Sequence, residues 1–486
     1  MHSLNHTALK NKTSKKPMRS ILSTKEKALR LNLDSSTYGT IAEIGGGQEV
    51  ARNFFQAGGA SGTLAKTISA YDKTFSDHNY QSKTNRYVSK DRLKAMLEKE
   101  FGELEILLGN KQPSRKHFAF ANTVETLNFH KTNKGHGWMG ITFQTEPMKK
   151  ANHIYIHVKL LENDNNLQQY SLGTLGINLI WAAFNYREKP NTFLKSLLDN
   201  LDTDRVEIDF IRMKGPDLDF IDNRLLAVQL VKNGMTPAII FDRNGLVQQP
   251  GDLLYKKNVL AFRGSFRPIT YVGMDMLRTA FSIFKTDKTY SKENTFCFCE
   301  ITLNNLQKTG EFNEKDFLQR VDILNGMGQN VMVSSFEEFY KLSDYFSSLK
   351  INKLRIVVGI LTFTKIFDPS YYNKLNGGIL EAIGRLFKNN TKLYVYPASN
   401  KEDNTLLDST NMDLPNDIKH IYNYLVENRR ILDIKNHNKA WIEFFPHDVI
   451  KKIKNNDNSW ELMVPKFVSK QIKKHELFGY RKELNW

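Results

Sequence analysis

Cysteine is nearly absent from this chain, whose 486 residues include only Cys297 and Cys299. This scarcity excludes a disulfide framework, and neither thiol has the C-x-x-C or C…H spacing that a zinc site needs. Both lie in one apolar segment, and on a strand they would point to the same face. We therefore expect reduced thiols that pack as small hydrophobic side chains, as in a reducing cytoplasm.

Long apolar runs are also missing. The basic N-terminus has no apolar core, so we do not read it as a signal peptide, and residues 1–17 are expected to form a disordered basic tail. The longest apolar stretch, residues 172–184, is shorter than the roughly 20 residues that span a bilayer. We expect no membrane span and a cytoplasmic location.

Charge of one sign predominates, because 69 Lys and Arg residues face 52 Asp and Glu residues and give a formal charge of +17. This excess raises nucleic acid or an anionic membrane as partners. However, the lysines are scattered among asparagines along the whole chain instead of forming one stripe. Nucleic-acid binding through the basic ends is therefore a candidate that the pattern does not favour.

The chain divides by pattern into a tail (1–17), a helix-rich N-terminal region with glycine hinges (18–150), an α/β core domain (151–400) and a basic helical C-terminal region (401–486). Apolar strands alternate with amphipathic helices from residue 206 onward, which predicts an α/β fold with a mostly parallel sheet covered on both faces. The predicted strands are 206–211, 238–241, 259–262, 296–302, 330–333, 354–360 and 393–396. An open doubly wound sheet is favoured over a barrel, since residues 241–259 are too short for a crossover helix.

Three histidines lie in two local patterns. His153 and His157 alternate with apolar residues around position 155, which predicts a strand with one wet face and surface histidines. His136 lies between Gly135 and Gly137, where we expect a flexible turn. It is either a general base or an incidental loop histidine.

A strand followed by Gly45, Gly46 and Gly47 and then a helix is the most suggestive local motif. Glycines let a backbone approach a phosphate, and a helix N-terminus offers free N–H groups. The string EIGGG resembles the first motif of S-adenosylmethionine methyltransferases, whereas Val50 breaks the G-x-G-x-x-G spacing. The alternatives are a phosphate-binding turn and a tight turn that serves helix packing.

Basic and hydroxyl side chains follow several predicted strands. Parallel α/β sheets bind ligands beyond the carboxyl ends of their strands, so these side chains are expected to converge there. Guanidinium groups bind phosphate or carboxylate in a bidentate manner, which predicts a phosphorylated ligand. The candidate anion-binding residues, beside Gly45–Gly47, are Arg212, Lys214, Arg263, Ser265, Arg267 and Lys365.

Three carboxylates are candidates for acid–base catalysis or metal binding, with magnesium as the candidate metal: Asp209, Asp217 and Glu300. Asp209 lies in the middle of a predicted strand. It is either buried beside a cation such as an arginine, with a raised pKa, or exposed on an edge strand.

Long strings after Met18 resemble an uncharacterised bacterial family, and they cover nearly the whole chain. They include MRSILSTKEKALRL, IAEIGGGQEVARNFF, AGGASGTLAKTISAYD, VEIDFIRMKGPDLDFIDNRLL, FRGSFRPIT and NGGILEAIGRLFKNNTKLYVYP. Members of that family carry labels such as nicotinate-nucleotide adenylyltransferase or TonB-dependent receptor.

The residues of this chain fit neither label well. A TonB-dependent receptor needs a signal peptide and many alternating strands. A nicotinate-nucleotide adenylyltransferase needs a G-x-F-x-P-x-H-x-G-H loop, which the sequence lacks. Its I-S-S-T-x-x-R motif is echoed only around Ser23 and Thr24, with Lys27 in place of arginine and at the wrong end of the chain. The resemblance thus points to nucleotide-like ligands without assigning residue roles.

Our leading hypothesis is a cytoplasmic α/β protein that binds a phosphorylated or nucleotide-like small molecule, with a nucleotidyltransferase-type reaction as the candidate activity. The alternative is a non-enzymatic scaffold that assembles into a homo-oligomer. Nucleic-acid binding is the third hypothesis.

Overall fold

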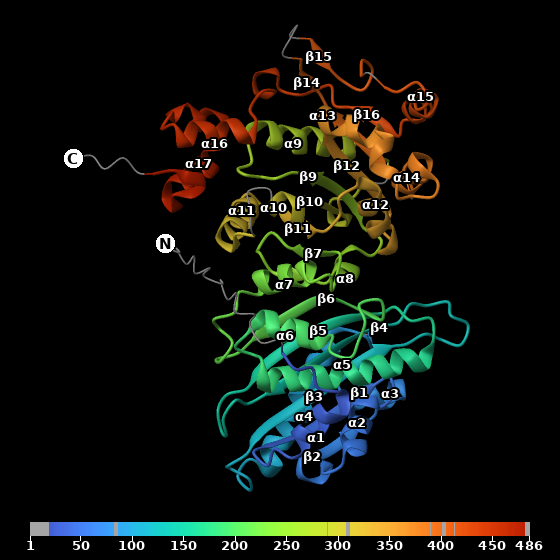
Figure 1. Cartoon of the computed structure of the whole chain (residues 1–486), viewed down its shortest axis with the longest axis vertical. Helices are drawn as coiled ribbons and strands as arrows, with labels where there is room; N and C mark the ends of the chain where they lie inside the picture. Colours follow the sequence, from blue (N-terminus) through green and yellow to red (C-terminus); the bar gives the residue numbers. More distant parts are fainter. Residues whose placement is uncertain are drawn as a thin grey trace, which may run out of the picture.

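The computed structural model describes residues 19–81, 86–288, 290–307, 312–388, 390–400, 405–412 and 414–481. The basic tail expected for residues 1–17 lies outside the described residues. Two large β-sheets follow one another along the long axis of the molecule, one built by the first half of the chain and one by the second (Figure 1). We call them the N-terminal sheet and the C-terminal sheet.

The N-terminal sheet has six strands in the order β2-β1-β3-β4-β5-β6. Strands β2, β1 and β3 are parallel, and β3 to β6 continue as an antiparallel meander. The strands are β1 (Thr37–Ile44), β2 (Leu64–Ile68), β3 (Lys116–Glu125), β4 (His136–Phe143), β5 (Asn152–Leu160) and β6 (Val206–Lys214).

Helices cover both faces of the N-terminal sheet. Helix α4 (Lys90–Leu108) packs on β1, β3 and β4, and the Ser89 hydroxyl caps it by accepting from the Arg92 N–H, as expected for a serine at this position. On the opposite face lie α1 (Thr24–Asn32), α2 (Glu49–Ala57), α5 (Asn165–Asn185), α6 (Pro190–Leu197) and α7 (Asn223–Lys232). The short helix α3 (Lys73–Asn79) precedes α4.

One sheet crosses the boundary that we expected near residue 150. Strands β5 and β6 hydrogen-bond to the meander that begins at β3, so residues on both sides of position 150 share a core. The region expected to be helix-rich also contains β1 to β4. The two β-sheets instead divide the chain between β6 and β7, near helix α7.

The C-terminal sheet has eight strands in the order β16-β13-β12-β9-β10-β11-β7-β8. Its bounds are β7 (Ala238–Phe241), β8 (Val247–Gln248), β9 (Asn258–Arg263), β10 (Thr295–Thr302), β11 (Asn330–Ser334), β12 (Lys353–Gly359), β13 (Lys392–Tyr396) and β16 (Ile431–Asp433). The six strands from β16 to β11 are parallel, whereas β7 and β8 are antiparallel to their neighbours.

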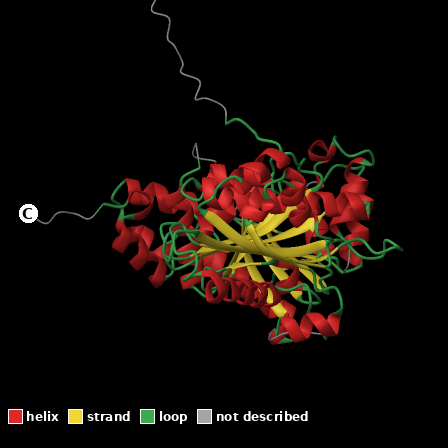
Figure 2. Ribbon diagram, turned by 90° about the horizontal axis from the view of Figure 1, so that it is seen from below, coloured by secondary structure: helices red, strands yellow, loops and turns green. Residues whose placement is uncertain are grey.

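Helices enclose the C-terminal sheet on both faces, and the strands of the molecule lie between layers of helices (Figure 2). One face carries α9 (Tyr271–Lys285), α11 (Glu314–Gly326), α16 (Pro446–Lys454) and α17 (Lys466–His475). The other carries α12 (Phe339–Ser348), α13 (Ile360–Phe363), α14 (Gly378–Leu386) and α15 (Lys419–Glu427). Shorter elements are α8 (Pro250–Leu254), α10 (Leu303–Gln307), β14 (Ala398–Ser399) and β15 (Leu406–Leu407).

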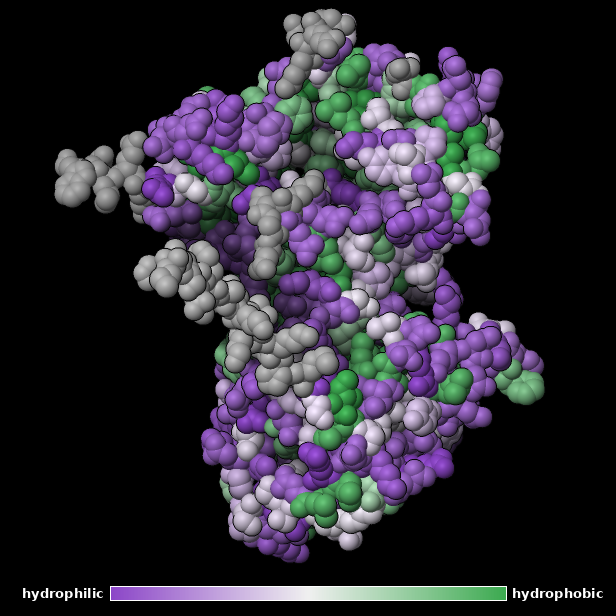
Figure 3. Space-filling model, in the orientation of Figure 1, coloured by the Kyte–Doolittle hydropathy of each residue, from purple (hydrophilic) through white to green (hydrophobic). Residues whose placement is uncertain are grey.

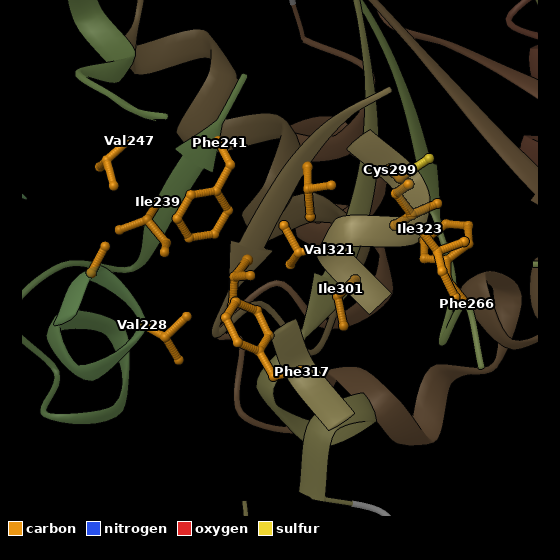
Figure 4. Packing of buried hydrophobic residues seen from close by; sticks show 14 of the residues in the cluster. Val228, Ile239, Phe241, Val247, Phe266, Cys299, Ile301, Phe317, Val321 and Ile323 are labelled. Atoms are coloured by element: carbon orange, nitrogen blue, oxygen red, sulfur yellow. The ribbon is translucent and has the colours of Figure 1, made fainter. Parts of the chain in front are cut away.

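The packing of α11 shows why the sequence pattern predicted alternating strands and helices. Phe317 and Val321 lie one helical turn apart and meet Phe241 of β7 and Ile301 of β10 (Figure 4). All four side chains are fully buried. Apolar residues four positions apart on the helix pack on an apolar strand, and together they bury one continuous surface.

The fold is α/β with open sheets, as expected, and the C-terminal sheet is mostly parallel, whereas the N-terminal sheet mixes both directions. Each large sheet begins and ends on an edge strand, so neither closes into a barrel. All seven strands predicted after residue 206 are present, but the first of them, β6, belongs to the N-terminal sheet. In the described part of the chain no helix is long and apolar enough to cross a bilayer.

Both cysteine thiols are free and lie on β10. Cys299 is buried, and Cys297 packs at the margin of the same hydrophobic cluster. Burial raises the pKa of Cys297 to about 12 and that of Cys299 well above its ordinary value. These thiols are therefore packing residues, as the sequence indicated.

Candidate functional site: a pocket at the switch point of the C-terminal sheet

Successive strands of the C-terminal sheet are added first on one side of β9 and then on the other. The chain runs from β9 to β10 and β11 on one side, then crosses over β9 to β12, β13 and β16 on the other. This is the doubly wound order 3-2-1-4-5-6, with the switch point between β9 and β12. Ligands of such sheets bind in the crevice that opens beyond the carboxyl ends of the strands at this point.

A pocket with a volume of about 310 Å³ lies at this switch point. The carboxyl ends of β9, β12 and β13 form its floor. The segment before α16 contributes Ile442 and Phe445, and α16 contributes its first residue, Pro446. Its wall is predominantly apolar, with a few hydroxyl groups. The main lining residues are Phe262, Arg263, Ser265, Phe266, Ile269, Thr270, Val272, Gly273, Met276, Gly359, Ile360, Thr362, Tyr396, Ile442 and Phe445.

The N-terminus of α9 opens into the pocket, because the first-turn residues Val272 and Gly273 belong to the lining. Thr270 occupies the N-cap position, and its side chain makes no capping hydrogen bond. The first-turn N–H groups of a helix have no partner within the helix and carry partial positive charge. They are therefore available to an anionic group of a ligand.

Arg263 ends β9 at the rim of the pocket, but its guanidinium is already engaged. Its Nε and Nη2 atoms donate to the Glu300 carboxylate at 2.9 and 3.0 Å, and Nη1 donates to the Glu337 carbonyl at 2.9 Å. Ser334 also donates to Glu300, which is fully buried. Glu300 thus neutralises and orients Arg263, so neither residue is free for the role that we expected.

The remaining expected anion ligands of the C-terminal sheet have different surroundings. Ser265 lies in the pocket wall. Arg267 donates from Nε to Asp316 at 2.9 Å. Lys365 is exposed in a short 3-10 helix after α13. Of the four expected anion ligands on the C-terminal sheet, only Arg263 and Ser265 line the pocket.

Arg212, Lys214 and Asp217 do not join this site, because β6 belongs to the other sheet. Asp217 instead accepts hydrogen bonds from Thr145 at 2.7 Å and Asn152 at 2.8 Å, and these two bonds lower the pKa of its carboxyl. The expectation that three arginines and two lysines converge at one sheet edge is therefore wrong. It rested on placing every strand after residue 206 in one sheet.

Asp209 is fully buried, which decides between the two alternatives for this residue. Its partners are His157 at 2.6 Å, Gln249 at 3.1 Å and Lys159 at 3.3 Å, instead of an arginine. Burial pushes the pKa of Asp209 upward, but His157 and Lys159 overcome it and hold that pKa below the ordinary value. His157 is correspondingly buried and not on a wet face.

The glycines after β1 serve packing. Gly45 has φ +85°, and a Cβ atom there would lie 2.0 Å from the Val124 carbonyl oxygen. The N-terminus of α2, where a phosphate would bind, accommodates the Glu43 carboxylate, which accepts from the Val50 and Ala51 N–H groups at 3.2 and 3.0 Å. The phosphate-binding interpretation of Gly45, Gly46 and Gly47 is therefore not supported, because a side chain already fills the anion position.

Residues distant in sequence complete the pocket. Tyr396 donates its hydroxyl to Asp275 at 2.8 Å, and Asp275 also accepts from the Asn438 N–H at 2.8 Å. The C-terminal segment closes over this pair, with Trp441 stacked on Tyr271 at 4.9 Å between ring centroids. Tyr396 is identifiable in sequence as the end of a strand, whereas no sequence signal places residues 438–446 here.

Comparisons with known proteins leave the family open. No family model matches the chain, and no curated protein matches it. Solved structures that match include the crystal structure of the competence/damage inducible protein CihA from Agrobacterium tumefaciens. It is 14% identical, with a TM-score of 0.25, and the match covers 34% of this chain and 98% of that one.

The described residues contain no group of three or more His, Cys, Asp and Glu side chains arranged to hold a metal ion. The expected carboxylates are accordingly dispersed. Asp209 and Asp217 lie in the N-terminal half, and Glu300 is bonded to Arg263.

Proposed function

We propose that the C-terminal sheet binds a nucleotide-like or otherwise phosphorylated small molecule in the switch-point pocket. The supporting observation is the position of this pocket, which lies at the carboxyl ends of β9 and β12 where the doubly wound order reverses. Its apolar walls suit a planar ring, and the α9 N-terminus suits a phosphate.

The proposal differs from a standard dinucleotide site in one respect. The turn after β9 reads RGSFRPIT and has a single glycine, Gly264, in place of a G-x-G-x-x-G turn. Arg263 is neutralised by Glu300, so the α9 N-terminus has to supply the main attraction for an anion. We expect recognition by the apolar walls together with one phosphate instead of a clamp of several arginines.

Binding is better supported than catalysis in this pocket. Among the described residues the lining includes no carboxylate, histidine or lysine. Arg263 and Tyr396 are its titratable groups, and each is already bonded to a buried carboxylate. A nucleotidyltransferase reaction would therefore need acid–base groups supplied from outside the lining.

Thermal unfolding of the full chain tests the proposal against nucleotides, dinucleotides, sugar phosphates and S-adenosylmethionine, with and without magnesium. A ligand at 100 times its dissociation constant stabilises the folded state by about 2.7 kcal/mol. We expect at least one compound to raise the unfolding temperature.

A glycine at the floor of the pocket allows a blocking variant. Gly359 has extended dihedral angles, φ −75° and ψ 148°, which any residue can adopt, and a Cβ atom there would approach only Met276, at 3.9 Å. Gly359→Leu should therefore fill the pocket. Gly384→Leu is the matched control, because Gly384 lies on α14 with nothing within 4 Å. Loss of the shift in both variants, or in neither, would contradict the proposal, as would a wild-type chain that no compound stabilises.

A further inference from the structure

A second site lies at the seam between the two sheets, on the face of the N-terminal sheet that also carries α4. His136 of β4, His157 of β5 and Asp209 of β6 form a continuous hydrogen-bonded row. His157 Nδ1 lies 2.6 Å from Asp209 Oδ1, and His157 Nε2 lies 3.2 Å from His136 Nδ1. The row runs from a fully buried carboxylate to a partly exposed ring.

A β-bulge creates this row. Across β5 and β6, His157 pairs with Phe210 and Val158 pairs with Ile208, which leaves Asp209 as the extra residue. Bulges redirect a side chain, and here the carboxylate meets the His157 ring. Gln249, at the start of α8 in the C-terminal half, donates to Asp209 Oδ2 at 3.1 Å and holds it from the other side.

The row orients His136 when His157 is neutral. In that state the ionised Asp209 carboxylate accepts the proton that His157 carries on Nδ1. The Nε2 lone pair of the neutral His157 then accepts from His136 Nδ1–H. The Nε2 lone pair of His136 remains, and the side chain of His136 is 35% exposed. This arrangement resembles the way in which a carboxylate orients a catalytic imidazole.

An ammonium group lies beside the row. Lys90 Nζ is 4.3 Å from the centre of the Phe210 ring and 5.9 Å from that of Trp138, which itself packs edge-on against His157. Within the described part of the chain Lys90 makes no hydrogen bond or ion pair, and burial lowers its pKa to about 8. A cation without a carboxylate partner is suited to stabilise a developing negative charge.

We propose that this seam is a hydrolytic centre for carboxylic esters, with His136 as the general base, Lys90 as the cation beside the carbonyl oxygen, and His157 and Asp209 as positioning residues. A neutral acyl group fits better than a phosphate, since Glu125 lies 3.9 Å from His136 Nε2 and would repel an anion. One unpaired ammonium matches the single negative charge of a tetrahedral intermediate.

The reaction balances with water as the only co-reactant. A water molecule gives a proton to His136 Nε2 while its oxygen bonds to the carbonyl carbon, and the carbonyl oxygen becomes an oxyanion beside Lys90. The ester C–O bond then breaks, and the leaving oxygen takes the proton from His136. The products are a carboxylic acid and an alcohol, and the ring returns to its starting tautomer.

Hydrolysis of p-nitrophenyl acetate by the full chain tests the proposal, with release of p-nitrophenolate as the readout. We expect His136→Gln to lower the rate at least tenfold and Lys90→Met to lower it severalfold. His78→Gln is the matched control, because His78 is an exposed histidine on α3 outside the row, and its rate should equal that of the wild type. Equal rates for wild type and His136→Gln would overturn the proposal.

The pH profile separates a positioning role for Asp209 from a structural one. Burial lowers the pKa of His136, and His157 lowers it further when it is protonated, whereas the carboxylates Glu125, Asp252 and Asp209 raise it. The net shift is downward, so the rate should fall only below the ordinary histidine pKa. The Asp209 charge raises that pKa, so Asp209→Asn should shift the midpoint to lower pH and reduce the plateau rate severalfold. An unchanged midpoint and plateau in a folded variant would refute the relay.

A measurement on the unmodified chain keeps the proposal testable if Asp209→Asn does not fold. In histidine-selective ¹⁵N spectra at pH 7, the resonances of His136 are those that are present in the wild type and absent in His136→Gln. We expect a protonated Nδ1 and an unprotonated Nε2. A proton on Nε2 would contradict the proposed base.

Discussion

Removal of Arg263 isolates the ion pair at the rim of the switch-point pocket. In Arg263→Met, the Glu300 carboxylate loses two hydrogen bonds, at 2.9 and 3.0 Å, and keeps one from Ser334 at 2.6 Å. Glu300 is 0% exposed, so water cannot replace the lost donors without local opening. We therefore expect the buried Glu300 carboxylate to keep too few hydrogen bonds to compensate for its loss of hydration.

The magnitude follows from the burial of both partners. Removing one partner of a buried ion pair costs about 3–5 kcal/mol, because the remaining charge stays desolvated. The Arg263 side chain is 9% exposed, and it also covers the Phe339 ring at 4.3 Å, so we expect a loss near the middle of this range. Replacement of both charged groups, in Arg263→Met with Glu300→Leu, should recover most of the loss.

Urea denaturation followed by circular dichroism measures the free energy of unfolding of the single variant, the double variant, a control variant and the wild type. Glu338→Gln is a control for general loss of a carboxylate in the same region, since its ion pair with Lys341 is partly exposed. The reasoning is refuted if Arg263→Met loses less than about 1 kcal/mol, or if the double replacement is no more stable than the single one.

Three further predictions concern positions outside the two sites. Burial raises the pKa of Glu43 to about 7, so the folded chain holds this proton where the unfolded chain releases it. This stabilisation, about 3 kcal/mol, is complete below pH 4.5 and is lost as pH rises through 7. Urea denaturation across this range should show this fall in the free energy of unfolding in the wild type but not in Glu43→Gln. Gly45→Ala should destabilise the chain in thermal unfolding by more than Gly58→Ala, because both have positive φ but Gly58 has open space around it; equal losses would show that the contact with Val124 is unimportant. Because burial raises both thiol pKa values, a disulfide reagent at pH 8 should label Cys297 and Cys299 only after denaturation; rapid labelling of the native chain would disprove this.

Local pattern identified six of the eight strands of the C-terminal sheet, and the short strands β8 and β16 were not predicted. Its parallel strands are short apolar runs such as Val331–Val333 and Leu393–Tyr396, separated by helices whose apolar residues recur every three or four positions. Such runs are typical of strands that are buried on both faces. The surface carries mixed polar and apolar residues and is hollowed in several places (Figure 3). Sequence pattern alone does not locate these hollows.

The meander of the N-terminal sheet was harder to predict. Strands β3 and β4 are buried along most of their length, so their side chains do not alternate between polar and apolar. Gly135 and Gly137 beside His136 indicated a turn, whereas Gly137 lies within β4, where a Cβ atom would approach the Val124 side chain at 2.5 Å. Close packing between strands, and not local flexibility, requires that glycine.

The sequence by itself determined the α/β class and the presence of seven strands after residue 206, because these depend on the periodicity of neighbouring side chains. Only the tertiary structure decided which strand joins which sheet. That assignment separates Arg212 from Arg263 and pairs Arg263 with Glu300. It also brings Asp209 to His157 and His136, because strand pairing joins residues that are 21 and 52 positions apart. Pairing over such distances reflects the burial of whole faces, which no local segment encodes.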